Sequence, residues 1–134
     1  MSHIPVVPQI YAAFGRGDTP ASLEKLSDSV EWEYGLAPNP VPWLQPRKGR
    51  AGAAEFLESL AALEFHKFAP KVFLETPGLV VVLIDLEVTV KATGKRIVEE
   101  DEGHIWHFDG AGEVIRFRHL VDSLQHAMAH QGEA

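Results

Sequence analysis

The sequence predicts a single α+β domain, covering residues 1–134, in which helices and a curved antiparallel sheet enclose an apolar pocket. A chain of this length suits one domain with its own core. Segments in which apolar residues recur at helical spacing come first, and long segments in which they alternate follow. Helices followed by a run of strands are typical of an α+β fold, whereas a regular β–α–β alternation would indicate a parallel sheet.

Three helices are expected in the first half of the chain. One face of the first consists of apolar residues at helical spacing: Val7, Ile10, Tyr11 and Phe14. Asp18 offers a cap for a short second helix that carries Leu23 and Leu26. The face of the third helix is expected to contain Ala53, Phe56, Leu57, Leu60 and Ala61. A short fourth helix is expected over residues 123–130.

The strands are indicated by alternation and by turn residues. Val30, Trp32 and Tyr34 alternate with glutamates, which predicts a strand. Residues 35–49 contain four prolines, so a loop is expected there, and its Trp43 is expected to fold back over the core or the mouth of a pocket. Further strands are expected at residues 71–75, 79–91, 96–108 and 114–121.

The long strands differ between their two faces. One face of residues 79–91 is apolar throughout: Val80, Val82, Ile84, Leu86, Val88 and Val90. In the next two strands, one shared face contains Glu102, His104, Trp106 and Phe108, and another contains Phe117, His119 and Val121. If these faces meet, the interior is an apolar cup with two histidines and a carboxylate, which is typical of a small-molecule site.

Composition excludes several other functions. The net charge of −7 argues against nucleic acid or an anionic membrane as a partner. No segment approaches the ~20 apolar residues of a membrane helix, and the N-terminus lacks the pattern of a signal peptide. The absence of cysteine fits a reducing compartment, so a cytoplasmic location is expected.

Several short motifs, taken in order, resemble those of a known family. They are residues 10–14 leading to Gly17-Asp18, residues 28–32, residues 49–57, residues 106–110 and residues 116–122. Through them the chain resembles the NTF2-like superfamily, within its SnoaL-like and ketosteroid-isomerase-related branch. The resemblance implies a cone-shaped barrel of three helices packed on a strongly curved antiparallel sheet, and a homodimer formed through the outer face of that sheet. It also implies a repertoire of isomerases, polyketide cyclases, epoxide hydrolases, dehydratases and non-catalytic binders.

The ketosteroid isomerases use an aspartate base, with a tyrosine and a protonated aspartic acid as the oxyanion hole. By spacing, their base position falls on Glu33 or on Tyr34. Their tyrosine position falls on Ile10, one residue before Tyr11, and their aspartic acid position falls on His104. The missing tyrosine argues against ketosteroid isomerisation, whereas glutamate can act as a base and histidine can donate to an oxyanion.

The candidate catalytic groups are His104, His119, Asp122 and Glu33. An inward imidazole titrates near neutrality and suits acid/base catalysis, although His104 and His119 could each be a buried histidine bonded to a neighbouring strand. Asp122 would either orient a histidine or cap the final helix. In a regular strand either Glu33 or Trp32 faces the core, not both, unless a bulge intervenes.

The candidate ligand-binding residues form the walls of the cup, unless they simply fill a core: Trp106, Trp43, Trp32, Tyr34, Phe56, Leu86, Val88, Glu102 and Phe117. No metal and no cofactor are expected. Alternation divides the acidic residues 99–102 between two faces, so only Glu102 and His104 would converge. His126 and His130 stand four residues apart without an apparent third ligand, and we expect them on a frayed surface helix.

The leading hypothesis is a SnoaL-like enzyme that acts without a cofactor, by acid/base chemistry, on a small hydrophobic molecule. The same cup in a binding module would hold a small molecule or a peptide without chemistry. A structural role in dimerisation is the third hypothesis, and a filled core would favour it.

Overall fold

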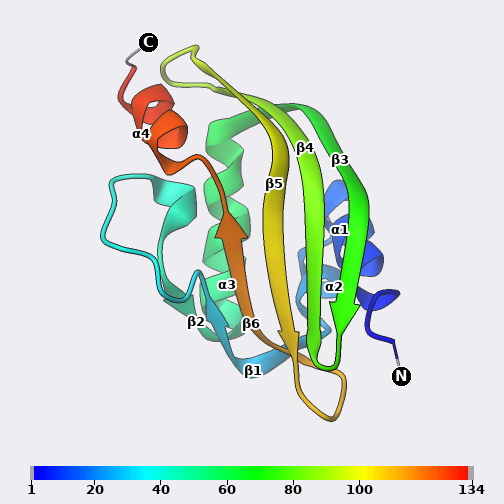
Figure 1. The fold of residues 1–134 in the computed structure, drawn as a ribbon. Helices are drawn as coiled ribbons and strands as arrows, with labels where there is room; N and C mark the ends of the chain where they lie inside the picture. The colour runs from blue at the N-terminus through cyan, green and yellow to red at the C-terminus, as the bar shows by residue number, and fades with distance from the viewer. Residues whose placement is uncertain (1, 133–134) are drawn as a thin grey trace.

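The computed structural model describes residues 2–132, which form one layer of sheet with helices against it (Figure 1). The helices are α1 (Val6–Gly15), α2 (Thr19–Leu23), α3 (Gly49–Ser59) and α4 (Ser123–Gln131), with short 3₁₀ turns at Pro42–Leu44 and Leu60–Ala62. The strands are β1 (Leu26–Trp32), β2 (Arg47–Lys48), β3 (Leu63–Thr76), β4 (Leu79–Val90), β5 (Arg96–Phe108) and β6 (Val114–Leu120). They form one sheet in the order β2-β1-β6-β5-β4-β3.

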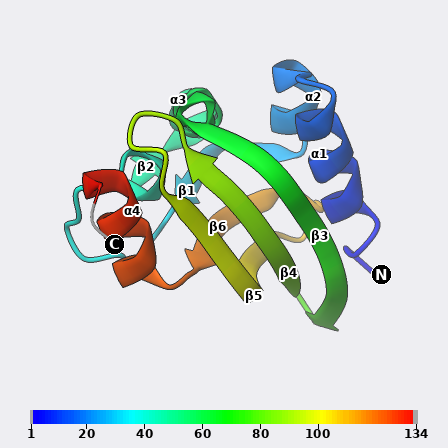
Figure 2. The same ribbon diagram turned by 90° about the horizontal axis from the view of Figure 1, so that it is seen from above.

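The predicted α+β class and the cone-like architecture are confirmed. The long strands β3, β4 and β5 curve strongly, and helices α1, α2 and α3 lie on the concave side (Figure 2). The sheet is mixed rather than wholly antiparallel, because β1 runs parallel to β6. The whole meander of β3, β4 and β5 separates these two strands in the chain, so β1 can join the far side of β6 in the same direction. The sheet does not close, and α4 adds a fourth helix to the three of the family pattern.

The core lies in the concavity of the sheet. Burial alternates along the whole of β4, and Val80, Val82 and Val88 are fully buried on the predicted face. Helices α1 and α3 cover this face with Val7 and Phe56 among their buried residues. Apolar residues alternate along the strands and recur at helical spacing along the helices, and these two patterns mark the faces that pack together. The sequence therefore indicated this core.

The starts of β1 and β3 differ from the expectation. Leu26 begins β1 instead of ending the second helix. Strand β3 begins at Leu63, eight residues before the predicted start, and pairs with β4 over its whole length. Its register shifts twice, between Phe65 and Lys67 and between Pro70 and Val72, so no single alternation runs through it.

Within residues 2–132, two non-glycine residues adopt a positive φ, and the alternation of inward and outward side chains breaks at each of them. Glu33 (φ 56°) directly follows β1, and Asp101 (φ 63°) lies within β5. The register with β4 shifts at Asp101, where Glu99 pairs with Leu86 and Glu102 pairs with Ile84. Such a bulge adds one residue to one strand, so side chains three positions apart reach the same face. Both departures lie beside the cavity described next.

None of the helices within residues 2–132 combines the length and the apolar character that a bilayer crossing requires.

Candidate active site

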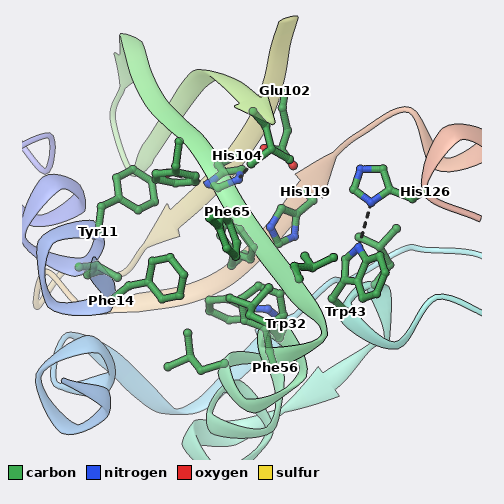
Figure 3. A pocket seen from close by; sticks show the side chains of 18 of the residues that line it. Tyr11, Phe14, Trp32, Trp43, Phe56, Phe65, Glu102, His104, His119 and His126 are labelled. Carbon is green, nitrogen blue, oxygen red and sulfur yellow. Dashed lines mark hydrogen bonds and ion pairs between the residues drawn. The ribbon is translucent and has the colours of Figure 1, made fainter. Parts of the chain in front are cut away.

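A cavity of about 80 Å³ lies between the concave face of the sheet and helices α1 and α3 (Figure 3). That is several times the ~10–15 Å³ in which a single water fits. Its apolar lining comes from Ile10, Phe14, Trp32, Trp43, Leu44, Phe56, Leu57, Leu60, Leu63, Phe65, Phe68, Leu86, Trp106 and Phe117. Its polar lining comes from Tyr11, Glu102, His104, His119 and His126. The cavity is therefore an apolar cup with one polar side.

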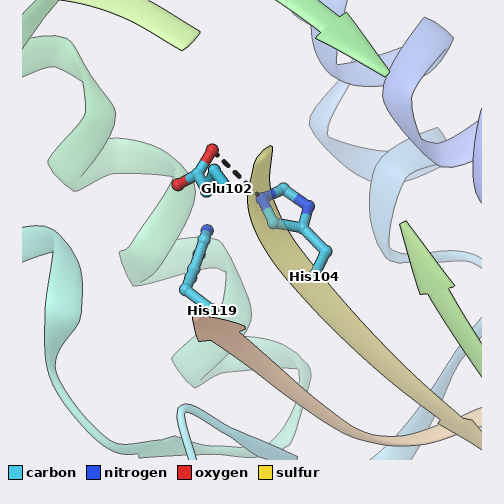
Figure 4. A group of neighbouring side chains, drawn as sticks. All are labelled: Glu102, His104 and His119. Atoms are coloured by element: carbon cyan, nitrogen blue, oxygen red, sulfur yellow. Dashed lines mark ion pairs between the residues drawn. The ribbon is translucent and has the colours of Figure 1, made fainter. Parts of the chain in front are cut away.

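Three polar side chains point toward one another on that side (Figure 4). His104 of β5 pairs directly with His119 of β6 in the sheet register, and Glu102 stands two residues before His104. The Nε2 atom of His104 lies 3.7 Å from a carboxylate oxygen of Glu102, which is too long for a hydrogen bond. All three are buried, and the described residues offer the His104 Nε2 atom no hydrogen-bond partner. Buried polar atoms are nearly always hydrogen-bonded, so this nitrogen is suited to bind a group that enters the cavity.

Tyr11 holds His104 from the other side. Its hydroxyl lies 2.7 Å from Nδ1 of His104 and accepts a hydrogen bond from Nε1 of Trp106 at 3.2 Å. Burial raises the pKa of Tyr11, so the hydroxyl stays protonated. Because a hydroxyl can donate or accept, Tyr11 supports either neutral tautomer of His104, with Nε2 carrying a proton or a free lone pair.

Tyr11 is the one polar cavity residue on α1, whereas the spacing of the family motifs had placed the tyrosine position one residue earlier, on Ile10. The helical spacing of Val7, Tyr11 and Phe14 was the available signal, because it had already placed Tyr11 on the inner face of α1.

Glu33 holds His119 in the same way. Its carboxylate accepts hydrogen bonds from the backbone N–H of His119 at 2.7 Å and from Nδ1 of the same residue at 2.9 Å. Glu33 is fully buried, and Trp32 beside it is buried as well. A regular strand would turn one of these neighbours away from the core, but the strand is irregular here: the positive φ of Glu33 turns the chain and brings both side chains inward. Glu33 lies behind His119 and does not line the cavity.

The environments of the three polar groups set different charge states. Burial lowers the pKa of His104, which keeps its imidazole neutral near pH 7. Burial also opposes the charge on His119, but the Glu33 carboxylate outweighs it and raises the pKa of His119. Burial would raise the pKa of Glu102, but the neighbouring histidines, His104 foremost, lower it, so Glu102 remains a carboxylate. These environments thus favour the neutral form of His104 and the charged forms of His119 and Glu102.

His126 of α4 forms a separate buried group, contrary to the expected frayed surface helix. Nε1 of Trp43 donates to its Nδ1 at 2.9 Å, and its Nε2 is hydrogen-bonded to Glu99. An indole N–H can only donate, so Nδ1 of His126 is the acceptor and Nε2 carries the proton. Glu99 faces inward because of the bulge at Asp101, so more acidic groups converge here than strand alternation allowed.

Besides Glu33, three sequence-predicted site residues lie outside the cavity lining. The Asp122 carboxylate caps α4 by accepting from the backbone N–H of Gln125, so the capping alternative holds. Tyr34 follows the turn after β1, and its hydroxyl contacts His107 outside the cavity. Val88 is fully buried in the core but does not reach the cavity wall. The other predicted wall residues line the cavity: Trp32, Trp43, Phe56, Leu86, Glu102, Trp106 and Phe117.

Comparison with protein-family models matches residues 7–117 to the SnoaL-like domain. None of the curated protein sequences is significantly similar to this chain. Among solved structures, an NTF2-like protein of unknown function from Burkholderia pseudomallei is 25% identical, with a TM-score of 0.81 over 96% of this chain and 98% of that one. An NTF2-like protein from Burkholderia xenovorans is 24% identical, with a TM-score of 0.83 over 96% and 95% of the two chains. TerC, co-crystallised with polyporic acid, is 25% identical, with a TM-score of 0.74 over 96% and 98%.

Proposed function

Because this chain belongs to the SnoaL-like branch of the NTF2-like proteins, we propose that it is an enzyme that converts a small hydrophobic molecule in its cup without a cofactor. The observation that carries this proposal is the convergence of Glu102, His104 and His119 on one side of an otherwise apolar cavity. Paired acid and base groups in different charge states are typical of acid/base active sites.

Each of the three groups has a distinct role in the proposed chemistry. The Glu102 carboxylate is the general base and takes a proton from a C–H or O–H group of the substrate. The His119 imidazolium, supported by Glu33, donates to the oxygen on which negative charge develops. Neutral His104, positioned by Tyr11, gives or accepts a hydrogen bond at Nε2 next to the same oxygen.

The cavity walls support a substrate with an apolar body. Trp32, Trp106 and Phe117 pack closely on one another, and the Trp32 and Phe117 rings stack at 4.2 Å. Nε1 of Trp32 is buried without a hydrogen-bond partner in the described chain, so it can donate to a polar group of the substrate. The co-crystal of TerC with polyporic acid supports a small organic molecule as occupant.

A turnover assay of matched variants tests the proposal. Thermal-shift screening of hydrophobic ketones, lactones and epoxides identifies ligands, and each ligand is then followed for conversion. Glu102→Gln and His119→Gln are expected to lower kcat by about 10²–10⁴, the usual contribution of a general acid or base. His66→Gln, which removes a partly exposed histidine on β3, serves as the control and leaves kcat unchanged.

The result also decides between an enzyme and a binding module. If both Glu102→Gln and His119→Gln retained the wild-type kcat, the assigned acid/base roles would be wrong. If ligands bound without conversion, and affinity survived both substitutions but fell with Trp106→Ala, the binding module would be supported instead.

A further inference from the structure

We propose that Glu102, His104 and His119 also form a binding site for one divalent transition-metal ion of the zinc type. The proposal rests on the positions of these side chains and does not depend on the acid/base function. It replaces the expectation that only Glu102 and His104 converge, because His119 supplies the third ligand.

The three groups already have nearly the spacing that a metal requires. One carboxylate oxygen of Glu102 and one ring nitrogen of each histidine lie within 4.8 Å of one another. In a tetrahedral zinc site with bonds of about 2.0–2.1 Å, neighbouring ligand atoms are about 3.3 Å apart. The separation of 3.7 Å between His104 Nε2 and Glu102 therefore needs to shrink by only a few tenths of an ångström.

The supporting contacts are those of a metal site. Tyr11 holds the Nδ1 atom of His104, and Glu33 holds the Nδ1 atom of His119, so each ring presents Nε2 toward Glu102. Metal-binding histidines usually carry a partner of this kind on the other nitrogen, which fixes the orientation of the ring. His104 Nε2, buried and without a partner in the described chain, is the atom that such an ion would satisfy.

In a second group, Glu99, Glu102 and His126, the possible ligand atoms also lie within 4.8 Å of one another, but His126 has no ring nitrogen free to bind a metal. Both ring nitrogens of His126 are engaged, Nδ1 by Trp43 and Nε2 by Glu99. Because the Trp43 indole can only donate, Nδ1 of His126 must stay an acceptor and Nε2 must keep its proton. His119 differs, because it can release its Nε2 proton to a metal and keep the Nδ1 proton that the Glu33 carboxylate accepts. The structure therefore favours the group that contains both His104 and His119.

The ligand set also indicates the class of ion. Two imidazoles and one carboxylate favour Zn²⁺, Fe²⁺, Co²⁺ or Ni²⁺, whereas Mg²⁺ and Ca²⁺ favour oxygen ligands. Because the three groups border the cavity, the fourth position of the ion would open into it. A bound ion would use the same atoms as the proposed acid/base chemistry, so we expect Zn²⁺ to inhibit turnover.

Metal titration of the full-length protein tests the site. After EDTA treatment and removal of the chelator, Zn²⁺ is titrated calorimetrically, and one equivalent is expected to bind. X-ray absorption of the zinc-loaded wild-type protein is expected to show two imidazole ligands, a result that needs no variant. Failure of the folded wild-type protein to bind Zn²⁺, Co²⁺ or Ni²⁺ would overturn the proposal.

Variants assign the ligands. His104→Gln, His119→Gln and Glu102→Gln are each expected to weaken Zn²⁺ binding at least 10-fold, and Glu33→Gln about 10-fold. His66→Gln is the control for adventitious binding at the surface and leaves the affinity unchanged. Loss of binding in His126→Gln but not in His104→Gln would refute this ligand assignment, with circular dichroism verifying that each variant is folded.

Turnover in the same samples separates this site from the proposed function. Zinc binding that stops turnover supports both proposals. Zinc binding on which turnover depends supports the metal site and overturns chemistry without a cofactor.

Discussion

Tyr11→Phe removes one hydroxyl from the interior and leaves the ring in place. The Tyr11 hydroxyl bonds two groups at once, Nδ1 of His104 and Nε1 of Trp106. His104 is 4% exposed and Trp106 is 2% exposed, so water would not readily replace the lost partner. Each buried polar atom left unpaired costs about 1–3 kcal/mol, so we expect a loss of about 4 kcal/mol in the free energy of unfolding. That is a large fraction of the 5–15 kcal/mol that typically stabilises a domain.

Tyr34→Phe is the matched control, because it removes the same atom from the same type of residue. The Tyr34 hydroxyl also contacts a histidine, Nε2 of His107 at 2.6 Å. His107 is only partly buried, so water can replace the hydroxyl and the expected loss is below about 1 kcal/mol.

Urea unfolding of wild type, Tyr11→Phe and Tyr34→Phe, monitored by tryptophan fluorescence and by circular dichroism, measures both losses. Equal losses for the two variants would refute the reasoning, because burial of the partners would then not determine the effect. If Tyr11→Phe kept the wild-type kcat, the positioning of His104 by this hydroxyl would likewise be contradicted.

Two further predictions concern the backbone and pH. Asp101→Val should lower the free energy of unfolding, measured with urea, by about 2 kcal/mol, because a β-branched residue resists a positive φ. Asp101→Gly should stay within about 1 kcal/mol of wild type, because glycine adopts a positive φ without strain. Equal losses in the two variants would mean that the backbone at this bulge changes its conformation without cost. Burial and the charge of Arg116 lower the pKa of His107, so protonation favours the unfolded chain and stability falls as pH drops below about 6.5. When the pH is lowered from about 7.5 to about 5, the Tm of the wild type should therefore fall further than the Tm of His107→Gln. Tm profiles that run parallel over this range would contradict the lowered pKa of His107.

The inward faces of the long strands could be read from the sequence because side chains in a strand alternate with a fixed period of two. The predicted alternation of β4 holds from Leu79 to Val90. The same reasoning placed His104 and Trp106 together, and the register pairs them with His119 and Phe117. Local periodicity was sufficient here, since nothing interrupts the strand between these residues.

Alternation failed where the backbone turns through a positive φ. Glu33 and Asp101 are not glycines, and nothing in their identity required this conformation. Each turn brings an additional acidic side chain inward: Glu33 behind His119, and Glu99 beside His126. The sheet pairing, rather than the local sequence, selects such conformations.

By itself, then, the sequence determined the fold class, the apolar cup and the two inward histidines, all of which follow from short-range periodicity. The tertiary structure alone decided which partners hold those histidines. Tyr11 meets His104 across 93 residues of chain, and Glu33 meets His119 across 86. Such pairs depend on how α1 crosses the sheet and on the parallel pairing of β1 with β6, and no local pattern encodes either. The cup was predictable from alternation, whereas its chemistry depends on these long-range contacts.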